Sequence, residues 1–430
     1  MRHWLLFLLI FVAWLGLSPY LSLPWQGLGL TLLALLLWTL RPLPELHSAL
    51  LIPLLAFSDG MLPIGDLIEI GSSPTLAIFV FGFAFASLSR SQGLDTITLT
   101  AISHWANGSE RRASYLLFAL TALISMWTSN AVTTALMLPL ALMLGQHRSV
   151  AQQHYLAIAI TFSSTLGGMA TQAGSSTSFI ASNLTGLGFI DWMLLALPLS
   201  VALWLLAMVI LEYHFKPSFS DGIVLPKQAL NRQQWQALAL VALTIGGFVV
   251  ASILWRGSSQ WYGLIPVLGV VAMLALKLIT LPQLQRAIKY RVLLVFVAAI
   301  SLGKALQYSG GGQMLVDGLM PCLSDLPLPL QLGLLLLTIA LLTELMSNVT
   351  CAAILAPLLS LVLLPQGSSE QQIALLVGIG CALAFVLPTA TPSNSLMTGV
   401  AAVPLRQLAQ AGIKVKLATV LGLWGVLLLL

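Results

Sequence analysis

Charged residues are scarce in this chain of 430 residues, where Asp, Glu, Lys and Arg together make up only 7% of the sequence. Soluble domains carry roughly 25% charged residues, so the composition excludes an ordinary soluble protein. Apolar residues account for 58% of the chain, and the mean hydropathy is +0.98. Apolar stretches near the roughly 20 residues that a spanning helix needs recur along the whole length. The sequence therefore predicts an all-α polytopic membrane protein.

Cysteines and enzyme motifs are also lacking. Cys322, Cys351 and Cys381 are the only three cysteines, and their odd number and apolar context indicate core residues rather than disulfides or a metal site. The chain has no HExxH, no GxSxG and no GxxxxGK[ST] phosphate loop. We therefore expect no enzyme and no ATP-driven pump. The net charge of +5 does not indicate nucleic-acid binding, because the placement of the charges has a better explanation in membrane topology.

A Ser-Asn pair interrupts an apolar run twice. The first pair is Ser129-Asn130 and the second is Ser347-Asn348, and each Asn is followed nine residues later by a proline. The two pairs lie 218 residues apart, about half of the chain. Polar residues deep in a membrane protein are costly and are usually functional. A duplicated polar break indicates a binding site between two transporter repeats.

Each Ser-Asn pair lies midway in a segment whose two arms are short for spanning helices. We interpret residues 113–145 and 326–364 as re-entrant hairpins that enter from opposite faces, which makes the two halves an inverted repeat. The other apolar segments predict 11 transmembrane helices, two of them broken near 171–178 and 388–394. Their approximate ranges are 4–20, 26–40, 47–57, 74–90, 155–190, 192–213, 235–255, 260–277, 291–307, 371–402 and 415–430.

The distribution of basic residues supports this topology. With a cytoplasmic N-terminus and a retained first helix, all but Arg256 and Lys304 of the 18 Lys and Arg fall on or near the cytoplasmic side. Cytoplasmic loops of membrane proteins carry such an excess of positive charge. The prediction is a multi-pass protein of the cell inner (plasma) membrane.

The breaks carry chemistry because backbone that leaves a helix inside the membrane has unpaired N–H and C=O groups. Helix N-termini facing the gap suit an anion, while free carbonyl and hydroxyl oxygens suit a hard cation such as sodium. Two charged residues need separate interpretations. We interpret Glu344 as a structural carboxylate in preference to a ligand for a proton or a cation. We interpret Lys304 as a lysine that reaches the membrane interface in preference to a counter-charge for the substrate.

These residues resemble the divalent anion:sodium symporter family, which carries dicarboxylates, citrate and sulfate. That family has a Ser-Asn-Thr triplet in each hairpin and Pro-Pro-Asn-like breaks afterwards. This chain has Ser129-Asn130-Ala131 and Ser347-Asn348-Val349, with breaks at 174–178 and 390–394. The likeness runs from about residue 55 to 425 and includes the segment Leu62–Phe79.

The resemblance implies roles for individual residues and an assembly. The implied substrate-binding residues are Ser129, Asn130, Ala131, Ser347, Asn348, Val349 and Pro392. Sodium, the probable coupling ion, would be held at two sites, one formed by Ser125, Ser129, Asn130 and Gly174, the other by Thr343, Met346, Asn348 and Ala390. Family members are homodimers in membrane lipid, with a scaffold domain and a transport domain that moves like an elevator.

The resemblance also divides the chain into four segments. Residues 1–112 and 216–323 would form the scaffold, and residues 113–215 and 324–430 would form the two halves of the transport domain. The triplet threonines are replaced by Ala131 and Val349, which should weaken recognition of a dicarboxylate because a hydroxyl is lost on each side.

The resulting prediction is a secondary active transporter of small anions, with di- or tricarboxylates as the first candidates, coupled to sodium. Three alternatives of the same superfamily remain, namely a sulfate carrier, an arsenite carrier and a proton-coupled or exchange anion carrier. A non-transporting membrane subunit or a membrane enzyme is the alternative from another class.

Overall fold

The computed structural model describes residues 11–430 except 13, 15, 41–42, 73, 94–101, 103–104, 147, 220–229, 255–262, 315–316, 319–325 and 346. Every regular element in this described part is a helix, which confirms the all-α prediction. Six of the described helices are long and apolar enough to cross a membrane. The hydrogen-bonding needs of a backbone in lipid leave a chain of this composition little choice but helices.

The first half of the chain begins with four helices and continues through a helical hairpin into a broken helix. The bounds are α2 Leu23–Leu40, α3 Glu45–Ser58, α4 Ile64–Gly71, α5 Pro74–Gln92, α7 Glu110–Ser125, α8 Asn130–Leu144, α9 Val150–Gly168, α10 Ser176–Leu184 and α11 Phe189–Phe215. Helices α7 and α8 form the first expected hairpin, and α9 and α10 flank the expected break.

The second half follows the same order of elements. Its helices are α12 Arg232–Leu254, α13 Leu264–Ala275, α14 Leu281–Ala287, α15 Tyr290–Tyr308, α17 Leu328–Leu345, α18 Asn348–Leu363, α19 Glu370–Gly378, the short η3 Gly380–Ala382, α20 Pro392–Val400 and α21 Leu405–Leu427. Helices α17 and α18 form the second hairpin. Helix α21 begins ten residues before the expected 415, so it also includes Arg406 and Lys414.

Each hairpin turns at its Ser-Asn pair for a local reason. Ser129 and Ser347 are the N-cap residues of α8 and α18, with extended backbone angles of φ −65°, ψ 142° and φ −61°, ψ 133°. Serine is favoured at this position because its short polar side chain suits the change from extended to helical backbone. The two Asn residues are therefore the first residues of their helices.

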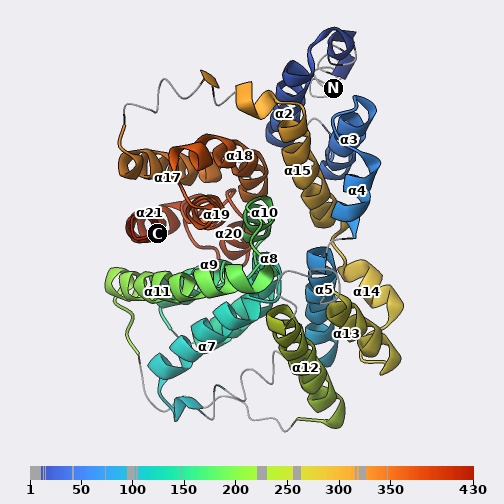
Figure 1. Cartoon of the computed structure of the whole chain (residues 1–430). Coiled ribbons are helices and arrows are strands. Elements are labelled where there is room, and N and C mark those ends of the chain that lie inside the picture. Colours follow the sequence, from blue (N-terminus) through green and yellow to red (C-terminus); the bar gives the residue numbers. More distant parts are fainter. Residues whose placement is uncertain are drawn as a thin grey trace.

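Helices α7–α11 and α17–α21 pack together, and we call them the hairpin bundle (Figure 1). The two halves interlock, since α10 packs on α18 and α19, and α20 packs on α8 and α9. The hydroxyl of Thr177 in α10 donates to the carbonyl oxygen of Gly378 in α19 at 2.6 Å. Each half of the chain therefore completes the packing of the other.

The remaining helices, α2–α5 and α12–α15, lie beside this bundle, and we call them the flanking helices (Figure 1). Helices α5, α12, α13 and α14 share an apolar core of their own around Phe81, Val241 and Met273. Helix α15 packs on α3 and also on α18 of the hairpin bundle. Matching glycines end α5 and α15, because Gly93 and Gly310 both have positive φ angles, 61° and 76°.

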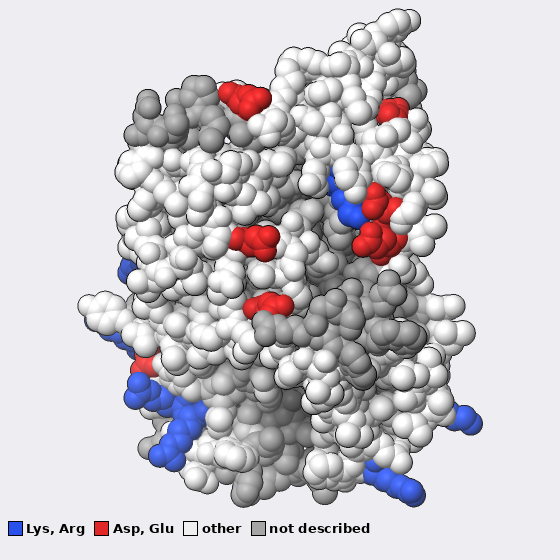
Figure 2. Space-filling view, viewed as in Figure 1, with Lys and Arg blue, Asp and Glu red and all other residues white. Residues whose placement is uncertain are grey.

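Charge is unevenly distributed over the surface. Figure 2 shows Lys and Arg mostly at one end of the visible face and Asp and Glu mostly nearer the other. Lys304 departs from this pattern because it pairs with Asp66 at 2.8 Å and with Glu69 at 3.1 Å. Two acids of α4 therefore neutralise Lys304, which the sequence did not predict, and its place at the membrane interface stays a prediction.

Candidate functional site

A cavity of about 1010 Å³ lies where the tips of the two hairpins meet. Its wall includes both Ser-Asn pairs, both helix breaks and a side contributed by the flanking helices. The described residues that line it are Phe79, Phe83, Ser129–Ala131, Thr165, Gly174–Thr177, Lys289, Leu345, Ser347–Val349, Ala382, Thr389–Ser393, Ser395 and Leu396. The cavity thus collects residues from both halves of the chain around one space.

Four helix N-termini border this cavity. Helices α8, α10, α18 and α20 begin at Asn130, Ser176, Asn348 and Pro392, and all four residues line the space. The first turn of a helix leaves N–H groups unpaired and carries a partial positive charge. In the described structure, no side chain caps the first turn of α8 or α18. The arrangement suits an anion, because the N–H groups can donate to it.

The structure brings all seven predicted substrate-binding residues to this cavity. Ser129, Asn130 and Ala131 line one side, Ser347, Asn348 and Val349 line the other, and Pro392 lies at the start of α20. Ala131 and Val349 occupy the places of the missing threonines, so the wall at these two points is apolar. Thr165, which the sequence interpretation did not single out, also lines the space, as does Thr177 of the first break.

Two polar atoms at the hairpin tips have no hydrogen-bond partner in the described structure. Ser129 Oγ and Asn348 Oδ1 are buried without one. An unpaired buried polar atom costs roughly 1–3 kcal/mol, so such atoms are rare unless a ligand or water completes them. Ser393 Oγ, next to Pro392, is in the same condition. A polar ligand between the two hairpins would satisfy these atoms.

Oxygen atoms gather around the side chain of Asn130. Asn130 Oδ1 lies 3.0 Å from Ser125 Oγ. The same atom lies 3.1 Å from the carbonyl oxygen of Ser164 and 3.2 Å from that of Gly174. The oxygen and nitrogen of an amide exchange places on a half-turn, so two arrangements are possible. Either the amide NH₂ donates to these oxygens, or four oxygens face one another and a cation holds them together.

The second predicted sodium set is less complete. Ala390 lines the cavity, and Asn348 contributes its unpaired oxygen. Thr343 is fully buried in α17, where its hydroxyl donates to the carbonyl oxygen of Ala340 at 3.2 Å. Met346 lies outside the described residues. The structure therefore assembles the first predicted set more fully than the second.

Glu344 holds the second break in shape. Its carboxylate accepts hydrogen bonds from the backbone N–H groups of Phe385, Val386 and Leu387, at distances from 2.9 to 3.3 Å. Lys416 of α21 pairs with the same carboxylate at 2.6 Å. A non-helical backbone inside a membrane protein needs such partners. The interpretation of Glu344 as a structural carboxylate is supported, and Lys416, expected at the cytoplasmic edge, is a buried member of this pair.

Lys289 is the one charged residue among the described residues that line the cavity. It precedes α15 and comes from the flanking helices. The sequence interpretation placed it in a basic surface connector over 278–291. Its position in the wall could not be read from a local pattern, because it depends on how α15 packs beside α18.

Comparison with known proteins identifies relatives over most of the chain. The citrate transporter family model CitMHS matches residues 33–380. An uncharacterized transporter of Haemophilus influenzae is 29% identical, with 96% of this chain and 93% of that protein covered. The sodium-dependent dicarboxylate transporter SdcS of Staphylococcus aureus is 23% identical, with 92% and 84% covered.

The fold is shared with a solved transporter structure as well. The YdaH transporter of Alcanivorax borkumensis superposes with a TM-score of 0.58 at 16% identity, covering 84% of this chain and 86% of that one. The relatives and the structural neighbour are transporters, which agrees with the prediction of a transporter and not an enzyme. Because the family model spans most of the sequence, the chain belongs to the citrate transporter family CitMHS.

Proposed function

We propose that the chain is a secondary active transporter that moves a small anion, with a di- or tricarboxylate as the first candidate, together with sodium. The observation that carries this proposal is the cavity bordered by four helix N-termini and Lys289, whose described wall contains no acidic residue. Carboxylates match such a wall because they accept several N–H groups at once. The family match and the dicarboxylate transport of SdcS support the same class of substrate.

Sodium coupling is supported by the oxygen cluster at Asn130. A hard cation prefers oxygen ligands, and this cluster offers two carbonyls and one hydroxyl, to which the Asn130 amide adds a fourth oxygen in one of its two orientations. A bound sodium ion would also offset part of the charge of an anion in the adjoining cavity. The ion gradient would then supply the driving force for uptake.

The alternating step is proposed to follow an elevator mechanism. Residues 113–215 and 324–430 contribute most of the cavity wall and would form the moving transport domain. Residues 1–112 and 216–323 contribute Phe79, Phe83 and Lys289 and would form the scaffold, the part through which two copies associate as a homodimer. The N-terminus is proposed to be cytoplasmic.

The alternatives of the superfamily differ in the chemistry that they require of the wall. Ala131 and Val349 leave two apolar points where the resembled family has hydroxyls, so a compact anion such as sulfate remains a second candidate substrate. An arsenite carrier would be distinguished by uptake of arsenite, a proton-coupled carrier by dependence on a proton gradient, and an exchange carrier by a requirement for an anion inside the liposome.

Uptake into liposomes is the test of the proposed function. We expect labelled citrate, succinate or sulfate to accumulate with an inward sodium gradient and not without one. Asn348→Ala should abolish uptake and anion binding, because it removes a side-chain amide of the cavity wall whose NH₂ group can donate to a carboxylate. The matched control is Asn183→Ala, whose exposed side chain bonds only to Phe179 of its own helix. Anion uptake at the same rate with and without a sodium gradient would refute the proposed symport.

Lys289→Gln is expected to raise the KM for the anion about tenfold, since a unit charge within several ångströms contributes roughly 1–2 kcal/mol in a hydrated cavity. The maximal rate should change less, because the substitution leaves the hairpin tips intact. The control is Arg286→Gln, which removes an exposed charge of α14 outside the cavity wall. Equal KM values for the two variants in an uptake assay would exclude Lys289 as a counter-charge.

A further inference from the structure

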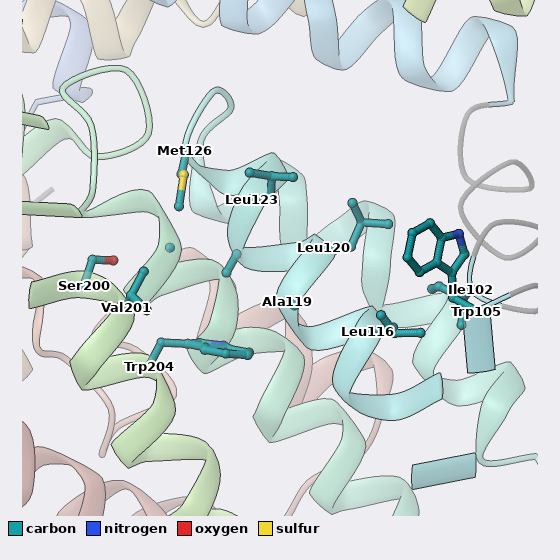
Figure 3. Close-up of a pocket in the computed structure, with 12 residues that line it drawn as sticks. Ile102, Trp105, Leu116, Ala119, Leu120, Leu123, Met126, Ser200, Val201 and Trp204 are labelled. Carbon is teal, nitrogen blue, oxygen red and sulfur yellow. The ribbon is translucent and has the colours of Figure 1, made fainter. Parts of the chain in front are cut away.

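A second cavity, of about 480 Å³, forms a groove between α7 and α11 (Figure 3). None of its described lining residues lines the substrate cavity. One wall is formed along α7 by Leu116, Ala119, Leu120 and Leu123, with Met126 just after the helix and with Ile102 and Trp105 near the Leu116 end. The opposite wall comes from α11, and its residues are Ser200, Val201 and Trp204. Both helices pack on α9, and Gly167 of α9 lines the groove between them.

The groove is almost entirely apolar and open to its surroundings. Its one hydroxyl, that of Ser200, donates to the carbonyl oxygen of Leu166, and Trp204 Nε1 donates to Ser163 Oγ at 2.9 Å. Leu123 is 54% exposed at its edge. Helix α11 is one of the helices long enough to span the membrane. An open apolar groove beside such a helix suits the hydrocarbon of a bilayer.

The corresponding place in the other half is closed. There α17 and α21 contact each other, because the ring of Trp424 covers Gly333, where an added Cβ would lie 3.0 Å from Trp424 Nε1. That nitrogen also donates to the carbonyl oxygen of Pro329 at 3.0 Å. A void without partner atoms loses dispersion contacts. The groove between α7 and α11 needs an occupant that the described chain does not supply.

The dimensions and the charge of the groove indicate that occupant. From Leu116 to Met126 the wall runs about 15 Å, half of a hydrocarbon core of about 30 Å and so one leaflet deep. One turn before Leu116, on the same face of α7, lies the exposed Arg112. Its neighbour Arg111 pairs with Glu212, whereas Arg112 has no hydrogen bond or ion pair to any described residue. A positive charge thus lies one turn beyond the Leu116 end of the groove.

We propose that this groove binds an anionic phospholipid, with one acyl chain between α7 and α11 and the phosphate beside Arg112. A bound chain would fill in the first half the space that Trp424 fills in the second. Because α7 is one arm of the first hairpin, the lipid would stabilise this helix without contacting the substrate cavity. This proposal does not depend on which anion the protein carries.

The test uses lipid-depleted full-length protein in detergent, titrated with dioleoyl phosphatidylglycerol or with dioleoyl phosphatidylcholine. Native mass spectrometry counts the lipids retained per chain, and the melting temperature gives an independent readout. We expect phosphatidylglycerol to bind about fivefold more tightly than phosphatidylcholine, the effect of one basic residue at an anionic headgroup. Arg112→Gln should remove this preference, while Arg406→Gln, an exposed charge at the start of α21, should preserve it.

Variants that fill the groove with a large side chain test whether the retained lipid binds there. Ala119→Trp, at an exposed position, should lower the count by one lipid per chain and leave the melting temperature in detergent unchanged. Val201→Trp tests the opposite wall in case the first variant folds poorly. An unchanged lipid count in both variants would overturn the proposal. So would a loss of dimers with the lipid count intact, because a second copy of the chain would then be the occupant.

Discussion

Gly168→Ala is expected to abolish sodium-dependent uptake in a protein that still folds. A Cβ at this position would lie 2.1 Å from Asn130 Oδ1 and 3.1 Å from the carbonyl oxygen of Gly174. Atoms do not approach so closely, so the Asn130 side chain must leave the oxygen cluster. The measurement is uptake as a function of sodium concentration, together with the melting temperature with and without sodium.

A matched glycine separates the local effect from a general cost. Gly399 lies in α20, and a Cβ there would meet nothing within 4 Å. Gly399→Ala should therefore transport like the parent protein. If Gly168→Ala kept both the rate and the sodium dependence, the cluster would be an ordinary amide hydrogen-bond network, with NH₂ pointing inward. Sodium coupling would then have to be sought at the second hairpin.

Glu344→Gln is expected to cause the largest loss of stability, about 3–5 kcal/mol, since it leaves a buried cation without its partner. The Glu344 and Lys416 side chains are each only 10% exposed. The amide of glutamine still offers one oxygen to the N–H groups of the break, so most of the loss should come from Lys416. Thermal unfolding of the purified protein in detergent is the measurement.

The double variant Glu344→Gln with Lys416→Met should recover much of this loss, because removing both charges leaves neither one unpaired. Arg111→Gln is the control for an exposed pair, with an expected cost below about 1 kcal/mol. If the double variant were as unstable as Glu344→Gln alone, the backbone hydrogen bonds and not the ion pair would hold the break.

Much of this architecture could be predicted from local sequence. The hairpin turns at Ser129 and Ser347 and the breaks after α9 and before α20 lie where short polar runs interrupt apolar ones, and such interruptions free backbone groups wherever they occur. The sequence also predicts that Ser129–Ala131 and Ser347–Val349 lie at one site, because the two segments repeat at about half the chain length. The number of crossings and their direction stay predictions.

Tertiary partners could not be predicted in the same way. Lys416 looked like a residue of the cytoplasmic edge, because its burial depends on Glu344, 72 residues earlier in the chain. The start of α21 was placed too late, since Arg406 and Lys414 lower the local hydropathy although they lie on a helix. Lys304 required the acids of α4, and Lys289 required the packing of α15 on α18.

The interlocking of the two halves limits how the cavity can open. Because α10 packs on α18 and α19, and α20 packs on α8 and α9, neither hairpin tip can swing away alone without breaking contacts such as Thr177 to Gly378. We infer that the two Ser-Asn pairs keep a constant separation throughout a cycle. Under the proposed elevator mechanism, access would alternate as the hairpin bundle slides past Phe79, Phe83 and Lys289. A crosslink between α10 and α18 should then leave turnover unchanged, whereas one between α15 and α18 should stop it.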